Sequence, residues 1–279
     1  MLRKIIIATL LFSWLIQPDF AIAITKKHHT HRIKHTKKKS PRIKRNRVSR
    51  PTHAIHTSHL TRTTVNTPNI QYSFFPSYLL TSMEKNLVKF VRNTVESIHY
   101  TTYKLGGTRI EPSKGIYIVD CSSYVDHILK TIYPRSYNSL AIWSGTSKPT
   151  TNDFYQYFQN LGDNSAHWNS IDDAEDLRPG DILVFRSKNR MGIETGGHVM
   201  IIMDKPVRNG NELLLRIADS APSGHSSDTR LLHRSGIGIG SMLLKINPHT
   251  LRPYAYAWTV DSRWETNVNF AMARPVDMG

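Results

Sequence analysis

The chain has 279 residues, a formal net charge of +16 at pH 7 and a single cysteine. One cysteine excludes an internal disulfide framework, and this length is enough for one domain with a substantial core. Residues 24–66 hold 13 Lys and Arg, 7 His and no acidic residue, whereas residues 67–279 hold 22 Lys and Arg against 20 Asp and Glu. The positive charge therefore belongs to an N-terminal tail, and the body of the chain is close to neutral.

The N-terminus is typical of a secretory signal. Arg3 and Lys4 give a charged start, residues 5–16 are apolar but too few to span a bilayer comfortably, and residues 21–23 form a small-x-small cleavage motif. We predict a signal peptide over residues 1–23, with an uncleaved anchor as the alternative. The mature chain shows no transmembrane helix pattern, so we expect an exported protein in the periplasm, at the cell surface or secreted.

Residues 24–66 are basic, rich in Thr and His, and poor in bulky apolar groups. Such a segment cannot bury enough surface to offset its ordering entropy, so we predict a disordered tail. Its charge would hold it to anionic polymers of the cell envelope. No aromatic residue interleaves the charges, which argues against a specific nucleic-acid partner. The cluster of His28, His29 and His31 could catch a transition metal, but a solvated tail is favoured, and we expect no metal or cofactor.

Residues 67–80 form a predicted linker to a single domain over residues 81–279. Thr81 and Glu84 fit a capping box at the start of a helix. One face of this helix is apolar, and its members are Leu87, Val88, Val91, Val95 and Ile98. We expect the helix to end before Gly106, with a loop over residues 107–115 and a short apolar segment over residues 116–119.

The cysteine stands at the start of a second predicted helix. Asp120 is a good N-cap, and Pro134 ends the helix. Apolar residues follow Cys121 at helical spacing, namely Val125, Ile128, Leu129 and Ile132. The helix dipole and the free N–H groups there favour a thiolate over a thiol. A small buried hydrophobe is the alternative, but an exported free thiol favours a nucleophile.

The remainder of the chain predicts an antiparallel sheet. Residues 135–150 read as irregular, and residues 152–161 read as a short helix. Strands are expected at residues 182–185, 199–203, 212–218, 241–246 and 254–260, with a glycine-rich loop before His198 and another loop over residues 220–240. Helices followed by an antiparallel sheet indicate an α+β domain.

A thiol nucleophile needs a base and a third group that orients the base. If Asn209 and Gly210 close a two-residue hairpin, Asp219 lies opposite Met200, and His198 lies two residues along the same face. A register with His198 directly opposite Asp219 would serve as well. A three-residue loop would put the two side chains on opposite faces. Two of the three registers therefore favour a Cys–His–Asp set.

Four segments in this order resemble the NlpC-type cell-wall cysteine peptidases of the papain-like superfamily, over roughly residues 80–260. They are Tyr103-Lys104-Leu105-Gly106-Gly107, Asp120-Cys121-Ser122-Ser123, residues 177–185 and Gly197-His198-Val199-Met200-Ile201. The resemblance implies a papain-like fold, in which the nucleophile helix and its neighbours pack on an antiparallel sheet. It also implies hydrolysis of amide bonds in peptidoglycan stem peptides.

The same resemblance assigns roles to individual residues. It implies Cys121 as nucleophile, His198 as base and Asp219 as third residue. It places Tyr103 near the active site, and it implies that Asp120 and Ser122 bind the free amine of the substrate.

The chain departs from the family at two positions. Ser123 stands where the family usually has Gly, and Asp219 stands where it more often has His, which leaves His225 as an alternative third residue. Two other functions stay open. One is an amidase or acyltransferase of the same fold with another substrate, and the other is a non-catalytic envelope-binding protein that acts through its basic tail.

The tail hypothesis makes a prediction about envelope binding. Binding of the mature chain to isolated cell envelopes should fall steeply with salt, because exposed charges are screened. Deleting residues 24–66 should weaken this binding and leave activity on small soluble substrates unchanged. Equal salt dependence with and without the tail, measured by co-sedimentation, would contradict it.

Overall fold

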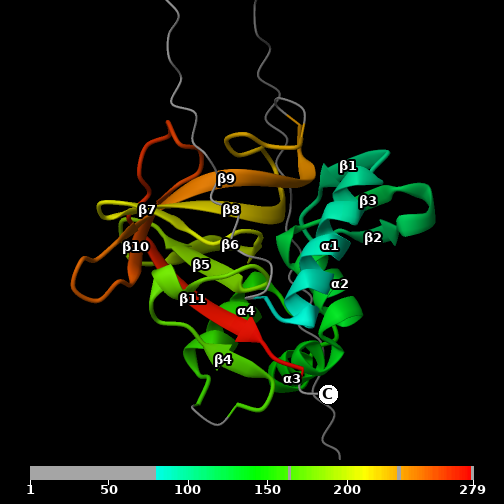
Figure 1. Ribbon diagram of the computed structural model, residues 1–279, viewed down its shortest axis with the longest axis horizontal. Helices are drawn as coiled ribbons and strands as arrows, with labels where there is room; N and C mark the ends of the chain where they lie inside the picture. Colours follow the sequence, from blue (N-terminus) through cyan, green and yellow to red (C-terminus); the bar gives the residue numbers. More distant parts are fainter. Residues whose placement is uncertain (1–79, 163–164, 231–233, 278–279) are drawn as a thin grey trace, which may run out of the picture. The chain divides into compact units, whose positions relative to one another are not determined.

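The computed structural model describes residues 80–162, 165–230 and 234–277. The predicted signal peptide, the basic tail and all of the linker except residue 80 lie outside the described residues. Within the described part, α-helices lie beside a large antiparallel sheet, as Figure 1 shows. The prediction of an α+β domain is confirmed at this level.

The described helices are α1 Ser82–Glu96, α2 Cys121–Ile132, α3 Pro134–Ser144 and α4 Thr151–Gln159. The predicted capping box of α1 is confirmed, because Glu84 N–H donates to Thr81 Oγ1 and Thr81 N–H donates to the Glu84 carboxylate. The prediction of an irregular segment at residues 135–150 is wrong. Pro134 lies beyond the end of α2 and is also the first residue of α3, a position where its fixed φ and missing N–H are tolerated. Within the described chain, every helix is too short or too polar to cross a membrane.

The large sheet has the strand order β10-β9-β8-β6-β5-β11-β4, with β7 paired to β8, and all of these pairings are antiparallel. Its strands are β4 Trp168–Ser170, β5 Ile182–Lys188, β6 Glu194–Ile202, β7 Val207–Asn209, β8 Glu212–Ala221, β9 Gly236–Ile246, β10 Pro253–Ala257 and β11 Val268–Pro275. Two predictions need correction. The glycine-rich loop before His198 belongs to β6, and both ends of the predicted loop over residues 220–240 belong to β8 and β9.

A small second sheet precedes α2. It consists of β1 Tyr100–Tyr103, β2 Thr108–Glu111 and β3 Ile116–Val119. β3 lies in the middle, parallel to β1 and antiparallel to β2. The prediction of a loop over residues 107–115 is therefore wrong. β1 and β2 are short and mostly polar, so their local pattern carries little strand signal, and pairing with β3 stabilises them.

Two hydrophobic clusters lie on opposite faces of the large sheet. β5 contributes to both, with Ile182 and Val184 in the cluster that holds the helices and Leu183 and Phe185 in the other. This alternation follows from the two-residue period of a strand. α2 lies in the first cluster, where Leu129 is fully buried with the rest of its apolar face.

The burial of α2 predicts how much it contributes to stability. Leu129→Ala should lower the free energy of unfolding by about 2–5 kcal/mol, because it removes buried apolar area and leaves a cavity. Thr131→Ala, at an exposed position of the same helix, is the control and should change stability by less than about 0.5 kcal/mol. Urea unfolding followed by circular dichroism measures both, and equal losses would contradict the burial of this face.

Candidate active site

Cys121 is the first residue of α2 and is 4% exposed. Asp120 caps the helix as predicted, because its Oδ1 accepts from the N–H of Ser123 at 2.8 Å and from the hydroxyl of Ser122 at 3.1 Å. Its Oδ2 accepts from the N–H of Gly106 at 2.8 Å. Asp120 thus ties the start of the helix to the turn between β1 and β2, and it fixes the position of the thiol.

The strands that carry His198 and Asp219 separate at the site. β6 and β8 pair at Ile201 with Ala218 and at Ile202 with Ile217, which is the register that the two-residue hairpin predicted. Beyond those pairs β6 continues along β5 and β8 continues along β9. The predicted hairpin itself needs correction, since the turn at Asn209 and Gly210 joins β7 to β8.

The start of α2 contacts both separated strands. The backbone N–H of Val199, on β6, donates a hydrogen bond to the sulfur of Cys121. On the other strand, the hydroxyl of Ser220 donates to the carbonyl of Val119 at 2.9 Å. The opening between β6 and β8 therefore places the thiol next to the end of the sheet that carries His198.

Electrostatics favour an ion pair between the thiol and the imidazole. Burial raises the pKa of Cys121, but the positive charge of His198 and hydrogen bonds from His198, Thr151 and the Val199 N–H outweigh burial, so the pKa is lower than that of an ordinary thiol. Burial lowers the pKa of His198, whereas the charge of Cys121 and the hydrogen bond with Asp219 raise it above its usual value. Both shifts stabilise a thiolate beside an imidazolium.

Asp219 holds the imidazole from the other side. Its side chain is fully buried, and its Oδ2 lies 2.6 Å from Nε2 of His198. This contact leaves Nδ1 of His198 for the hydrogen bond with Cys121. His225, the alternative third residue, contacts the same Oδ2 at 2.9 Å. The structure therefore brings Cys121, His198 and Asp219 together in series and places His225 behind the carboxylate.

Arg230 compensates the buried charge of Asp219. Its Nη2 donates to Oδ1 of Asp219 at 2.9 Å and to Asp228 at 2.6 Å, and its Nη1 donates to the carbonyl of Gly236 at 2.8 Å. Burial raises the pKa of Asp219, but the charges of His225 and Arg230 hold it well below its usual range. The carboxylate thus stays ionised without contact with water.

Arg230 and Asp228 were not predicted as site residues, although the sequence holds a signal for them. β9 carries glycine at every second position, at Gly236, Gly238 and Gly240. A Cβ at Gly238 would collide with Arg230 and Asp228, and a Cβ at Gly240 would collide with Asp228. Alternating glycines on a strand mark a bare face on which another segment lies.

Thr151 is a further site residue that was not predicted from the sequence. Its hydroxyl lies 3.3 Å from the sulfur of Cys121, at the start of α4. Gly197 makes this approach possible, because a Cβ there would meet the Thr151 side chain and the carbonyl of Phe185. The glycine beside His198 therefore accommodates another part of the protein.

Tyr103 also lies at this site. Burial raises the pKa of its phenol to about 12, with further contributions from the charges of Cys121 and Asp120. The phenol is neutral at physiological pH and can donate a hydrogen bond. All six residues predicted for the site therefore lie around the start of α2. They are Tyr103, Asp120, Cys121, Ser122, His198 and Asp219.

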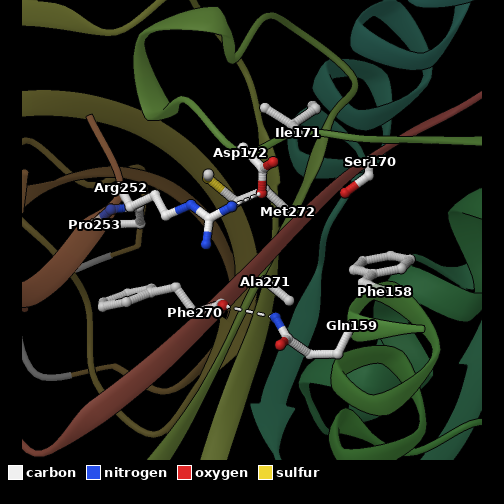
Figure 2. Close-up of a pocket in the computed structure, with 10 residues that line it drawn as sticks. All are labelled: Phe158, Gln159, Ser170, Ile171, Asp172, Arg252, Pro253, Phe270, Ala271 and Met272. Atoms are coloured by element: carbon white, nitrogen blue, oxygen red, sulfur yellow. Dashed lines mark hydrogen bonds and ion pairs between the residues drawn. The ribbon is translucent and has the colours of Figure 1, made fainter. Parts of the chain in front are cut away.

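A pocket of about 110 Å³ elsewhere in the molecule, drawn in Figure 2, contains none of these residues. It lies between α4, β4 and β11. Gln159 donates to the carbonyl of Phe270 at 3.3 Å, and Arg252 pairs with Asp172 at 2.9 Å. Arg252 and Asp172 thus pair with each other, and Gln159 is held by the backbone of β11.

Comparison with known proteins identifies no family. No family model matches the chain, and no solved structure matches it. The uncharacterized protein R653 of Acanthamoeba polyphaga mimivirus is 25% identical over an alignment of 169 residues, which covers 53% of this chain and 72% of the viral protein.

The lowered pKa of Cys121 predicts the pH dependence of its alkylation. The thiolate should persist below the free-thiol pKa of about 8.5, so iodoacetamide should react rapidly at neutral pH. His198→Asn should move the midpoint of the rate to higher pH, because the stabilising charge is lost. His249→Asn, at an exposed histidine, is the control. The mature chain has no other cysteine, so mass spectrometry reads the rate directly, and a midpoint unchanged by His198→Asn would contradict the ion pair.

Proposed function

We propose that this protein is an exported cysteine peptidase that hydrolyses amide bonds in peptidoglycan stem peptides. The observation that carries the proposal is the series Cys121, His198 and Asp219 at the start of α2. A nucleophile, a base and an orienting carboxylate in hydrogen-bond contact are the requirements of acyl transfer through a covalent intermediate. The peptide substrate and the papain-like fold come from the resemblance to the NlpC-type peptidases, and export comes from the N-terminal pattern.

The reaction uses both members of the ion pair. The thiolate of Cys121 attacks the amide carbonyl, and the carbonyl oxygen takes up the negative charge. The backbone N–H of Cys121, unpaired at the first turn of the helix, is placed to stabilise this oxyanion. His198 protonates the leaving amine as the C–N bond breaks. The neutral imidazole then takes a proton from water, which releases the acyl group from sulfur and restores the pair.

Asp219 orients the base and stabilises its charge. Its carboxylate keeps Nε2 of His198 engaged, which leaves Nδ1 for the hydrogen bond with Cys121. His225 and Arg230 hold the carboxylate in turn. The histidine therefore has little freedom to rotate away from Cys121 during the reaction.

Tyr103, Asp120 and Ser122 are proposed to contact the substrate. The Asp120 carboxylate accepts three hydrogen bonds from its own chain, and a carboxylate has about four acceptor positions. One position is thus left for a substrate amine. The neutral phenol of Tyr103 can donate to a substrate carbonyl.

Digestion of purified muropeptides tests the proposal. The mature chain should release products that match amide hydrolysis by mass, and Cys121→Ala should lower the rate by at least about a thousandfold because the nucleophile is lost. Asp219→Asn should lower kcat by about a hundredfold or more, because the histidine loses its orienting charge.

Two results would contradict this function. Muropeptides cleaved equally well by Cys121→Ala would exclude the thiol as nucleophile. Intact muropeptides under conditions in which Cys121 is rapidly alkylated would exclude the substrate and leave the chemistry of the site to another acyl compound.

A further inference from the structure

A second pocket of about 260 Å³ lies beside α2 and contains none of the residues assigned above. Its walls come from α2, from β2 and from the segment before α4. Ser123 and Asp126 line it from α2, Ile110 lines it from β2, and Lys148 lines it from the third side. The pocket therefore flanks the helix turn that carries Cys121 without using the thiol.

Two residues that line the pocket each have a buried polar atom without a hydrogen-bond partner among the described residues. Oδ1 of Asp126 makes no hydrogen bond, although the residue is only 4% exposed. Nε2 of the neighbouring His127 is also buried and unpaired. A buried polar atom without a partner destabilises the folded state by about 1–3 kcal/mol. Because Asp126 and His127 both line the pocket, a ligand that binds there can bring new partners to these side chains.

Two lysines line the same pocket, Lys130 and Lys148. Nζ of Lys130 is held 3.4 Å from the carbonyl of Ser147 and 4.5 Å from the centre of the Tyr137 ring. These contacts leave further N–H groups of Lys130 for a ligand, because an ammonium has three donors. Lys148 is an exposed residue that lines the pocket from the segment before α4.

The arrangement of charge narrows the class of ligand. Burial raises the pKa of Asp126 to about 8, Lys130 opposes this shift, and the carboxylates of Asp120 and Asp153 add to it. A group that brings a positive charge to Asp126 would relieve both the missing hydrogen bond and the repulsion from the other carboxylates. Lys130 and Lys148 are positively charged, so a negative charge on the same ligand would pair with them.

We propose that this pocket binds the zwitterionic end of an amino acid or a short peptide, with its ammonium on Asp126 and its carboxylate on Lys130 and Lys148. A simple anion would pair with the lysines and bring no positive charge to Asp126, whose pKa burial and the neighbouring carboxylates raise. A simple cation would satisfy Asp126 and meet two ammonium groups. The zwitterion matches both, and the volume of the pocket accommodates an amino acid with a side chain. The proposal does not depend on the proposed peptidase function, because none of these residues belongs to the Cys–His–Asp set.

Binding is tested on the mature chain with the Cys121→Ala substitution, so that hydrolysis plays no part. The probes are L-alanine and D-alanine, compared with alaninamide, which lacks the carboxylate, and N-acetylalanine, which lacks the ammonium. Backbone amide shifts of residues 123–130 are followed by NMR. We expect saturable shifts with at least one form of alanine, and affinities about tenfold weaker with both blocked compounds, since each loses one charge-assisted contact.

Variants of the pocket give a second measurement. Asp126→Asn keeps the shape of the side chain, and Lys148→Met keeps its length, and each should weaken alanine binding about tenfold. Lys85→Met, at an exposed position of α1, is the matched control and should bind as the parent does. Without ligand, the melting temperature of Asp126→Asn should be equal to or above that of the parent, because the substitution removes an unpaired buried acid.

Three outcomes would overturn the proposal. The first is the absence of saturable shifts up to the solubility limit of alanine. The second is equal binding of N-acetylalanine and alanine, which would make the pocket a plain anion site. The third is a lower melting temperature for Asp126→Asn together with unchanged binding, which would make Asp126 a structural residue. Failure of muropeptide cleavage would leave each of these measurements unaffected.

Discussion

The buried carboxylate of Asp219 constrains the rest of the site. A carboxylate without exposure to water stays ionised only if positive charges surround it, and here they come from Arg230 and from two histidines. Arg230 is itself buried, and Asp228 compensates its charge. The segment after β8 must therefore fold back over β9, and the alternating glycines of β9 provide the space. The orientation of His198 depends on this chain of compensated charges.

The separation of β6 from β8 is the second condition. In a continuous ladder the backbone groups of both strands would be used by each other. Because the pairing covers two residue pairs and both strands then follow other neighbours, the start of α2 can enter between them. Contacts from Val199 and Thr151 then reach the thiol. Sheet geometry and helix capping together bring the sulfur to the imidazole.

α2 contributes residues to two separate sites. Its first residue faces the sheet and the ion pair. Asp126 lines a pocket, and its buried Oδ1 has no hydrogen-bond partner in the described part of the chain. The two sites differ in their electrostatic design. Every charge around Asp219 is compensated within the described part of the chain, whereas the pocket leaves charges open toward a ligand. A network whose charges are all paired within the protein can hold a catalytic base in one orientation. A pocket with unpaired charged groups can bind a charged ligand.

The sequence by itself determined the local features of the site. The helix start at Cys121 and the cap at Asp120 follow from short-range patterns, because capping and periodicity depend on neighbours in the chain. The register of β6 against β8 was one of three alternatives, and the hairpin from which it was predicted joins β7 to β8 instead. Whether the chain adopts the papain-like fold, and whether the site is catalytic, stay predictions.

Only the tertiary structure decided the remaining features. The small sheet, α3 and the strands β4 and β11 were not predicted, since their short or mixed segments are stabilised by partners distant in sequence. Arg230, Thr151 and the pocket at Asp126 were not predicted from the sequence for the same reason. Charge compensation and hydrogen bonding depend on which residues are neighbours in space. The spacing of residues along the chain does not show which residues become neighbours.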